Sequence, residues 1–121
     1  MKIEKIIKNN TEIASIIARG IVIKDIKTAI DLMMNVKYEM GIKNIAIPKD
    51  AIINEFFVLS SGIAGEILQK VVNYQFRIAI YGDFSVYTSK PLKDFIFESN
   101  KGNTIFFVDS LESAISKLSN N

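Results

Sequence analysis

The chain has 121 residues, of which 49% are hydrophobic, which suits one compact domain with a buried core. Its 15 basic and 13 acidic side chains are interspersed and give a formal charge of +2, so nothing indicates nucleic-acid binding. It contains no cysteine or histidine, which excludes disulfides and removes the commonest general base and metal ligand. We therefore expect no metal, no cofactor and no enzymatic activity.

The first third of the chain predicts a hairpin followed by a helix. Residues 3–8 and 11–18 are rich in isoleucine and are separated by Asn9-Asn10, a turn signal. A helix is predicted from an N-cap at Asp25 to Gly41, because apolar residues between them recur at helical spacing. A short strand follows over 43–47. Residues 50–59 fit either a short helix or an extended segment.

The remaining elements alternate between helix and strand. We predict helices over 61–74, from Ser89 to Gly102, and from Ser110 onward, with strands over 75–81 and 104–108. The order is β-β-α-β-α-β-α-β-α, an α/β fold in a single domain over 1–121. Repeated βα units require parallel strands joined by right-handed crossovers, and the opening hairpin adds an antiparallel edge.

Ser60-Ser61-Gly62-Ile63-Ala64-Gly65 lies where an extended segment gives way to a helix. A serine there can cap the helix by accepting backbone N–H bonds. Alternatively, it can display a hydroxyl where the helix N-terminus would stabilise a phosphate. Ser60 and Ser61 are thus candidates for both roles.

A second polar segment follows the strand that ends at residue 81. The carboxyl ends of parallel strands lie at one edge of a sheet, so this loop and Ser60-Ser61 are expected to be neighbours. A small polar or anionic ligand, or a partner protein, could be held there, while the alternative is a polar loop with two helix caps. The contact candidates are Gly62, Asp83, Ser85, Ser89 and Lys90.

Three further features have structural explanations. Met33-Met34 and Phe56-Phe57 are expected in the core, although Phe56-Phe57-Val58 could instead form an exposed patch for a partner. The N-terminal edge strand and the Phe56-Phe57 region are the candidate surfaces for a homodimer. Asn100, close to the end of a helix, is expected to contribute to capping.

The element order and the segment Leu59-Ser60-Ser61-Gly62-Ile63-Ala64 resemble the STAS domain of bacterial anti-sigma-factor antagonists. That family carries Asp-Ser-Ser-Gly-Leu-Gly, or a close variant, at the start of its second helix, whereas Leu59 replaces the aspartate here. The resemblance implies that Ser61 is the residue phosphorylated by a partner kinase and that its phosphorylation controls partner exchange.

A closer resemblance, covering essentially the whole chain, is to a family of small bacterial proteins known only as a domain of unknown function. It rests on three segments and implies no established activity. The segments are Gly65-Glu66-Ile67-Leu68-Gln69-Lys70, Tyr81-Gly82-Asp83-Phe84-Ser85, and Asp94-Phe95-Ile96 with Glu98-Ser99-Asn100-Lys101-Gly102.

Taken together, the sequence favours a non-catalytic regulatory or protein-interaction module, with a small-ligand-binding domain as the alternative. No apolar run approaches the roughly 20 residues that a membrane-spanning helix needs, and the N-terminus does not read as a signal peptide. A cytoplasmic protein with an unidentified protein partner, and with neither nucleic acid nor membrane as a partner, is therefore expected.

Overall fold

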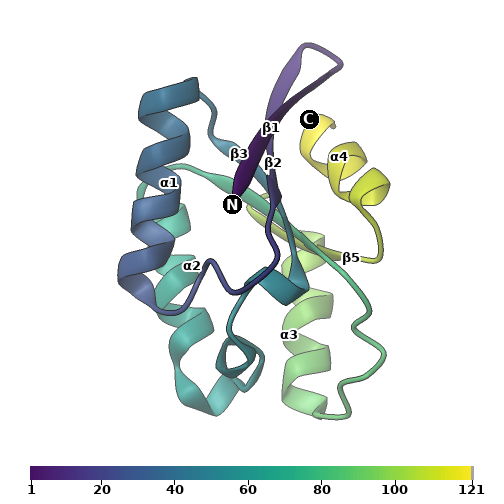
Figure 1. Ribbon diagram of the computed structural model, residues 1–121. Coiled ribbons are helices and arrows are strands. Elements are labelled where there is room, and N and C mark those ends of the chain that lie inside the picture. The colour runs from purple at the N-terminus through teal and green to yellow at the C-terminus, as the bar shows by residue number, and fades with distance from the viewer. Residues whose placement is uncertain (121) are drawn as a thin grey trace.

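Five strands form one sheet in the order β1-β2-β3-β4-β5 in the computed structural model, which describes residues 1–120 (Figure 1). β1 pairs with β2 in the antiparallel direction, and the remaining neighbours are parallel. The expected α/β class and mostly parallel sheet are thus confirmed. The strands are β1 (Lys2–Lys8), β2 (Thr11–Ile17), β3 (Asn44–Pro48), β4 (Arg77–Tyr81) and β5 (Ile105–Val108).

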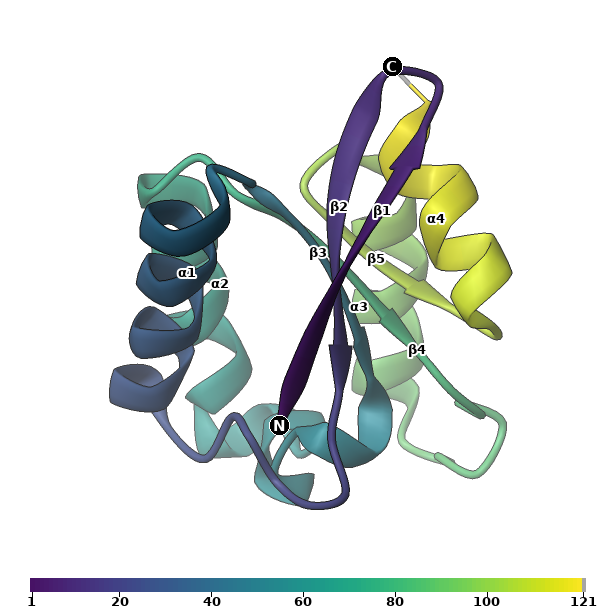
Figure 2. The same ribbon diagram turned by 45° about the horizontal axis from the view of Figure 1, so that its top comes forward.

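Three helices cover one face of the sheet and the last helix covers the other (Figure 2). Each right-handed crossover adds its strand on the same side of the previous one, so the intervening helices share a face. The last helix follows the edge strand β5 and can fold back over the opposite face. The helices are α1 (Ile26–Met40), α2 (Ile63–Asn73), α3 (Lys90–Lys101) and α4 (Leu111–Ser119).

The opening hairpin turns through Asn9 and Asn10, whose φ angles are 51° and 62°. Two positive φ angles in a two-residue loop define a type I′ turn, and asparagine tolerates this conformation better than most residues. The turn fixes the register of the hairpin, in which Lys8 lies opposite Thr11 and Lys2 opposite Ile17. The predicted hairpin is confirmed.

Local capping explains where the helices begin and end. The Asp25 side chain accepts a hydrogen bond from Thr28 N at 2.8 Å, and the Thr28 hydroxyl in turn accepts from Asp25 N at 3.1 Å. Gly41 ends α1 with a left-handed φ of 68°. Ser89 and Ser110 cap α3 and α4 by accepting from the N–H groups three residues on. These four predicted boundary residues are confirmed.

The segment that the sequence left open, between β3 and α2, forms three short 3₁₀ turns: η1 (Lys49–Ala51), η2 (Asn54–Phe57) and η3 (Leu59–Ser61). Residues from an earlier part of the chain hold this segment in place. The Ala51 carbonyl accepts hydrogen bonds from Val22 N and Ile23 N at 2.7 and 3.0 Å, and Ile23 bridges to Ile52 in parallel. As a result α2 begins at Ile63, two residues later than predicted.

Most of the core lies between the sheet and helices α1 to α3, and a smaller cluster lies under α4. Met33, Phe56 and Phe57 are buried in the larger cluster, as the core expectation required. Of the alternative exposed patch Phe56-Phe57-Val58, the two phenylalanines are buried and only Val58 is exposed, at 48%. Within residues 1–120, no helix has both the length and the apolar character needed to cross a bilayer.

Candidate functional site

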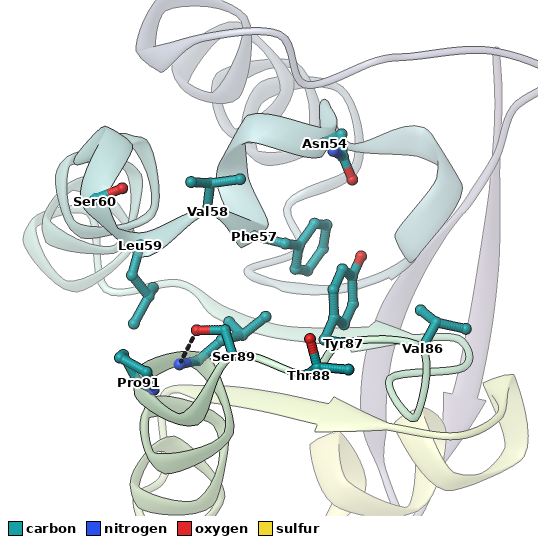
Figure 3. A pocket seen from close by; sticks show the side chains of 11 residues that line it. Asn54, Phe57, Val58, Leu59, Ser60, Val86, Tyr87, Thr88, Ser89 and Pro91 are labelled. Atoms are coloured by element: carbon teal, nitrogen blue, oxygen red, sulfur yellow. Dashed lines mark hydrogen bonds between the residues drawn. The ribbon is translucent and has the colours of Figure 1, made fainter.

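A groove of about 680 Å³ lies at the carboxyl end of β3 and β4, between the entry to α2 and the start of α3 (Figure 3). Its volume falls in the usual range for small-molecule sites, and the carboxyl edge of parallel strands is where α/β proteins usually bind ligands. Its lining comes from two stretches and from Asn54. The first stretch supplies Phe57, Val58, Leu59 and Ser60, and the second supplies Val86, Tyr87, Thr88, Ser89, Pro91 and Leu92.

The first wall of the groove is fixed by the buried ring of Phe57. Phe56 and Phe57 pack edge to face, with ring centroids 5.0 Å apart, and so anchor η2 in the core. The chain then rises to the surface, where Val58 is 48% exposed and Ser60 is also exposed. One wall therefore combines a rigid aromatic base with an exposed apolar rim and a hydroxyl.

The second wall is built around Tyr87, whose ring stacks on Phe57 with centroids 5.3 Å apart and an interplanar angle of 20°. This contact joins the loop after β4 to η2, and Figure 3 shows the two rings face to face. Next to it, the Ser89 hydroxyl accepts a hydrogen bond from Leu92 N at 3.3 Å. The expectation that this loop and the Ser60 segment lie side by side agrees with the geometry.

Lys49 secures the loop from the side of β3. Its ammonium group donates a hydrogen bond to the Asp83 carbonyl at 3.0 Å and lies 5.0 Å from the centre of the Tyr87 ring. Gly82, with a φ of 157°, packs closely on the same lysine: a Cβ atom there would lie 2.8 Å from Lys49 Cβ. A residue with a side chain at position 82 would displace either the lysine or the loop.

The lining of the groove is mostly apolar, and its polar groups are neutral. Its lining contains no carboxylate, lysine or arginine, and its polar groups are hydroxyls and the Asn54 amide. Within residues 1–120, no group of three or more acidic residues is placed to hold a metal ion. Aromatic and aliphatic surface with a few hydrogen-bonding groups fits a ligand that is mostly apolar and uncharged.

The structure divides the two serines that the sequence grouped together. Ser60 lines the groove, whereas Ser61 Oγ donates to the Glu55 carbonyl at 2.7 Å and accepts from Ile63 N at 3.3 Å. Gly62, with a left-handed φ of 81°, occupies the N-cap position of α2 and makes no side-chain cap. Ser61 thus joins η2 to the start of α2 and lies outside the lining of the groove.

Asp83 and Ser85 face a different hollow, of about 530 Å³, beside the end of β5. Phe84 lies between the two sites, with its ring centre 6.1 Å from that of Phe57 and 5.6 Å from that of Phe107. Hydrogen bonds from the Ser85 hydroxyl and backbone N–H lower the pKa of the Asp83 carboxyl below its ordinary value. The polar loop is therefore split into two sides by one aromatic ring.

Two further residues named from the sequence lie away from the groove. Lys90 forms an ion pair with Asp94 at 2.7 Å on the exposed side of α3 and does not line the groove. Asn100 is not a helix cap: its amide accepts from Phe107 N at 2.8 Å and donates to the Phe107 carbonyl at 3.0 Å. It binds the outer side of β5.

Sequence reasoning missed the apolar part of the groove. The polar candidates did not include the lining residues Asn54, Val86 and Tyr87, or Lys49, which supports the loop, and Phe57 and Val58 were considered only as a patch for a partner. Two signals were available. Lys49 follows β3 as Gly82 follows β4, and the loop after β4 contains the aromatic residues Phe84 and Tyr87, whose rings need partners to cover them.

The chain matches the model of one known protein family. The model of a family described as a domain of unknown function, DUF4180, matches residues 8–118, so the chain belongs to this family. No curated protein and no solved structure matches the chain.

Proposed function

We propose that this protein is a non-enzymatic binding domain whose groove takes a small, mostly apolar ligand. The observation that carries this proposal is the lining itself. A stacked Phe57–Tyr87 pair forms the base, exposed Val58 and Val86 form the rim, and no charged side chain takes part. An anionic ligand is not favoured, since Lys90 is paired with Asp94 away from the groove.

A matched pair of variants tests the proposal. Val86 and Val72 are 60% and 56% exposed, but only Val86 lines the groove. A thermal-shift screen of aromatic and aliphatic fragments should find compounds that raise the melting temperature of the wild type and of Val72→Asp. The same compounds should not stabilise Val86→Asp, because a carboxylate at the rim opposes apolar binding. Equal stabilisation of all three proteins would contradict the proposal.

A second candidate is a regulatory interaction module of STAS-like type, in a cytoplasmic setting. Its support is the element order and the position of Ser60-Ser61-Gly62 directly before α2. A phosphate on Ser61 would remove its hydrogen bond to the Glu55 carbonyl and add about −2 charge next to the groove. The two candidates are compatible if the modification changes what the groove binds.

Intact mass spectrometry of protein isolated from its native cells tests this second candidate. The expected result is a phosphorylated species that disappears in Ser61→Ala and persists in Ser60→Ala. If the phosphorylated species instead disappears in Ser60→Ala and persists in Ser61→Ala, the modified residue is Ser60, which lines the groove. If the protein is unmodified under all growth conditions, Ser61 has only its structural hydrogen bonds. That result would contradict regulation by phosphorylation.

A further inference from the structure

The two edges of the sheet are protected very differently. At one edge, β5 has four residues, and the Asn100 amide binds both backbone groups of Phe107, as a neighbouring strand would. At the other edge, β1 has seven residues and lies on the outside of the sheet, with α1 and α4 on either side (Figure 2). Open strand edges are templates for pairing with another chain.

The turn of the hairpin determines which backbone groups of β1 face outward. In a two-residue hairpin the closing pair, here Lys8 and Thr11, is hydrogen-bonded, and bonded pairs alternate along an antiparallel ladder. Lys8, Ile6 and Glu4 therefore direct their N–H and C=O groups toward β2. The N–H and C=O groups of Ile7 and Lys5 point away from the sheet.

We propose that two copies of the chain pair through β1, antiparallel about Ile6, to make one sheet that continues across both copies. In this register Ile6 lies opposite Ile6 of the second copy, and Lys5 lies opposite the second copy's Ile7. Lys5 and Ile7 are the residues whose backbone groups face outward, so each such pair forms two hydrogen bonds.

Charge favours this register over those centred on Lys5 and on Glu4. Glu4 lies opposite Lys8 of the second copy, and two-fold symmetry repeats the contact. Neither residue takes part in the ion pairs found within residues 1–120. Centring the pairing on Lys5 or on Glu4 would instead place like charges opposite each other, which is destabilising. A register centred on Ile3 opposes Lys2 and Glu4 but pairs only residues 1–5.

An exposed apolar side chain agrees with this surface. Ile7 is 64% exposed although it lies in a strand. Pairing in the proposed register covers Ile7 with the aliphatic part of the second copy's Lys5. A second copy also supplies a partner of the same length and of complementary charge.

Sedimentation equilibrium of residues 1–121 over a range of concentrations tests the pairing. The wild type should reach twice the 13.6 kDa chain mass. Glu4→Lys and Lys8→Glu should each weaken the dimer by about tenfold, because each opposes like charges twice. The double variant Glu4→Lys/Lys8→Glu should restore it. Glu39→Lys, which makes the same charge change on α1, should have no effect.

Each other outcome overturns the proposal. A monomer at every concentration up to about 1 mM excludes self-association that matters in a cell. Weakening by Glu4→Lys without weakening by Lys8→Glu points to the register centred on Ile3. A dimer that none of the charge reversals affects uses another surface. Thermal melts of each variant separate loss of pairing from loss of folding.

Discussion

The Asn100 side chain hydrogen-bonds to the backbone of β5 at the edge of the sheet, where a further strand could otherwise pair. Its amide both donates to and accepts from the Phe107 backbone, so it satisfies the two outward-facing groups of an edge strand. The residue lies in the last turn of α3 and thereby also links this helix to β5. The asparagine amide carries its donor and its acceptor on separate atoms, so it can bind the N–H and the C=O of one residue at the same time.

Asn100→Ala should therefore destabilise the fold by about 2 kcal/mol, since two hydrogen bonds are lost and two half-buried backbone groups lose their partners. Urea unfolding followed by circular dichroism measures this change. Asn73→Ala, at the exposed end of α2, is the control and should change stability by less than about 0.5 kcal/mol. Equal effects of the two variants would contradict the role assigned to Asn100.

The lowered pKa of Asp83 predicts how the stability of the protein depends on pH. Its pKa is lowered in the folded protein, first by the Ser85 hydroxyl and then by the Ser85 backbone N–H. The stability that follows from this is present above the ordinary value of 3.8 and is lost as the pH falls through the lower folded value.

In Ser85→Ala the pKa of Asp83 should move back toward 3.8, because the strongest of its hydrogen bonds is removed. An NMR titration of the Asp83 carboxyl carbon in wild type and variant measures the change. An identical pKa in both proteins would show that Ser85 does not hold the carboxylate in solution.

At the scale of elements, Arg77 connects β4 to α4. Its guanidinium donates to the Leu118 carbonyl at 2.9 Å, to the Asn103 carbonyl at 2.9 Å and to the Asn103 side chain at 2.8 Å. The Leu118 carbonyl belongs to the last turn of α4, where a cation also complements the helix dipole. Together with the apolar cluster under α4, Arg77 holds the only helix on this face of the sheet within residues 1–120.

Arg77→Lys should lower stability by about 2 kcal/mol, because a lysine cannot reach three acceptors with the planar geometry of a guanidinium. Hydrogen exchange of the α4 amides should accelerate more than that of α1 or α2. Uniform acceleration in all helices would indicate a general loss of stability rather than release of α4.

The sequence predicted those elements whose signals are local. Asp25, Gly41, Ser89 and Ser110 were identified as boundary residues because capping depends on a few neighbouring residues. The turns over 49–61 were not predictable in this way. Their position depends on hydrogen bonds from Val22 and Ile23 to the Ala51 carbonyl, which join segments far apart in the chain.

The sequence predicted where the groove lies but not most of the residues that line it. The rule for strand ends located the groove, and Ser60 and Ser89 do line it. Asp83 and Ser85 were assigned to the same side, but Phe84 packs between Phe57 and Phe107 and separates them from it. The packing of one ring cannot be read from residue types along a loop.

At the scale of the whole molecule, the protein has two distinct surfaces. The groove lies at the carboxyl end of β3 and β4, and the open strand β1 lies at the edge of the sheet. Pairing through β1 would leave the groove of each copy free, since no residue of β1 lines it. Ligand binding and self-association are therefore expected to be independent.

The most direct test of the groove is an NMR titration of the ¹⁵N-labelled protein with ring-bearing fragments such as indole and phenol. We predict shifts confined to the amides of residues 57–60 and 86–92, with Tyr87 among the largest, and none with acetate or phosphate. Fragment-induced shifts centred elsewhere, or shifts at these amides with phosphate alone, would contradict a groove that selects uncharged apolar ligands.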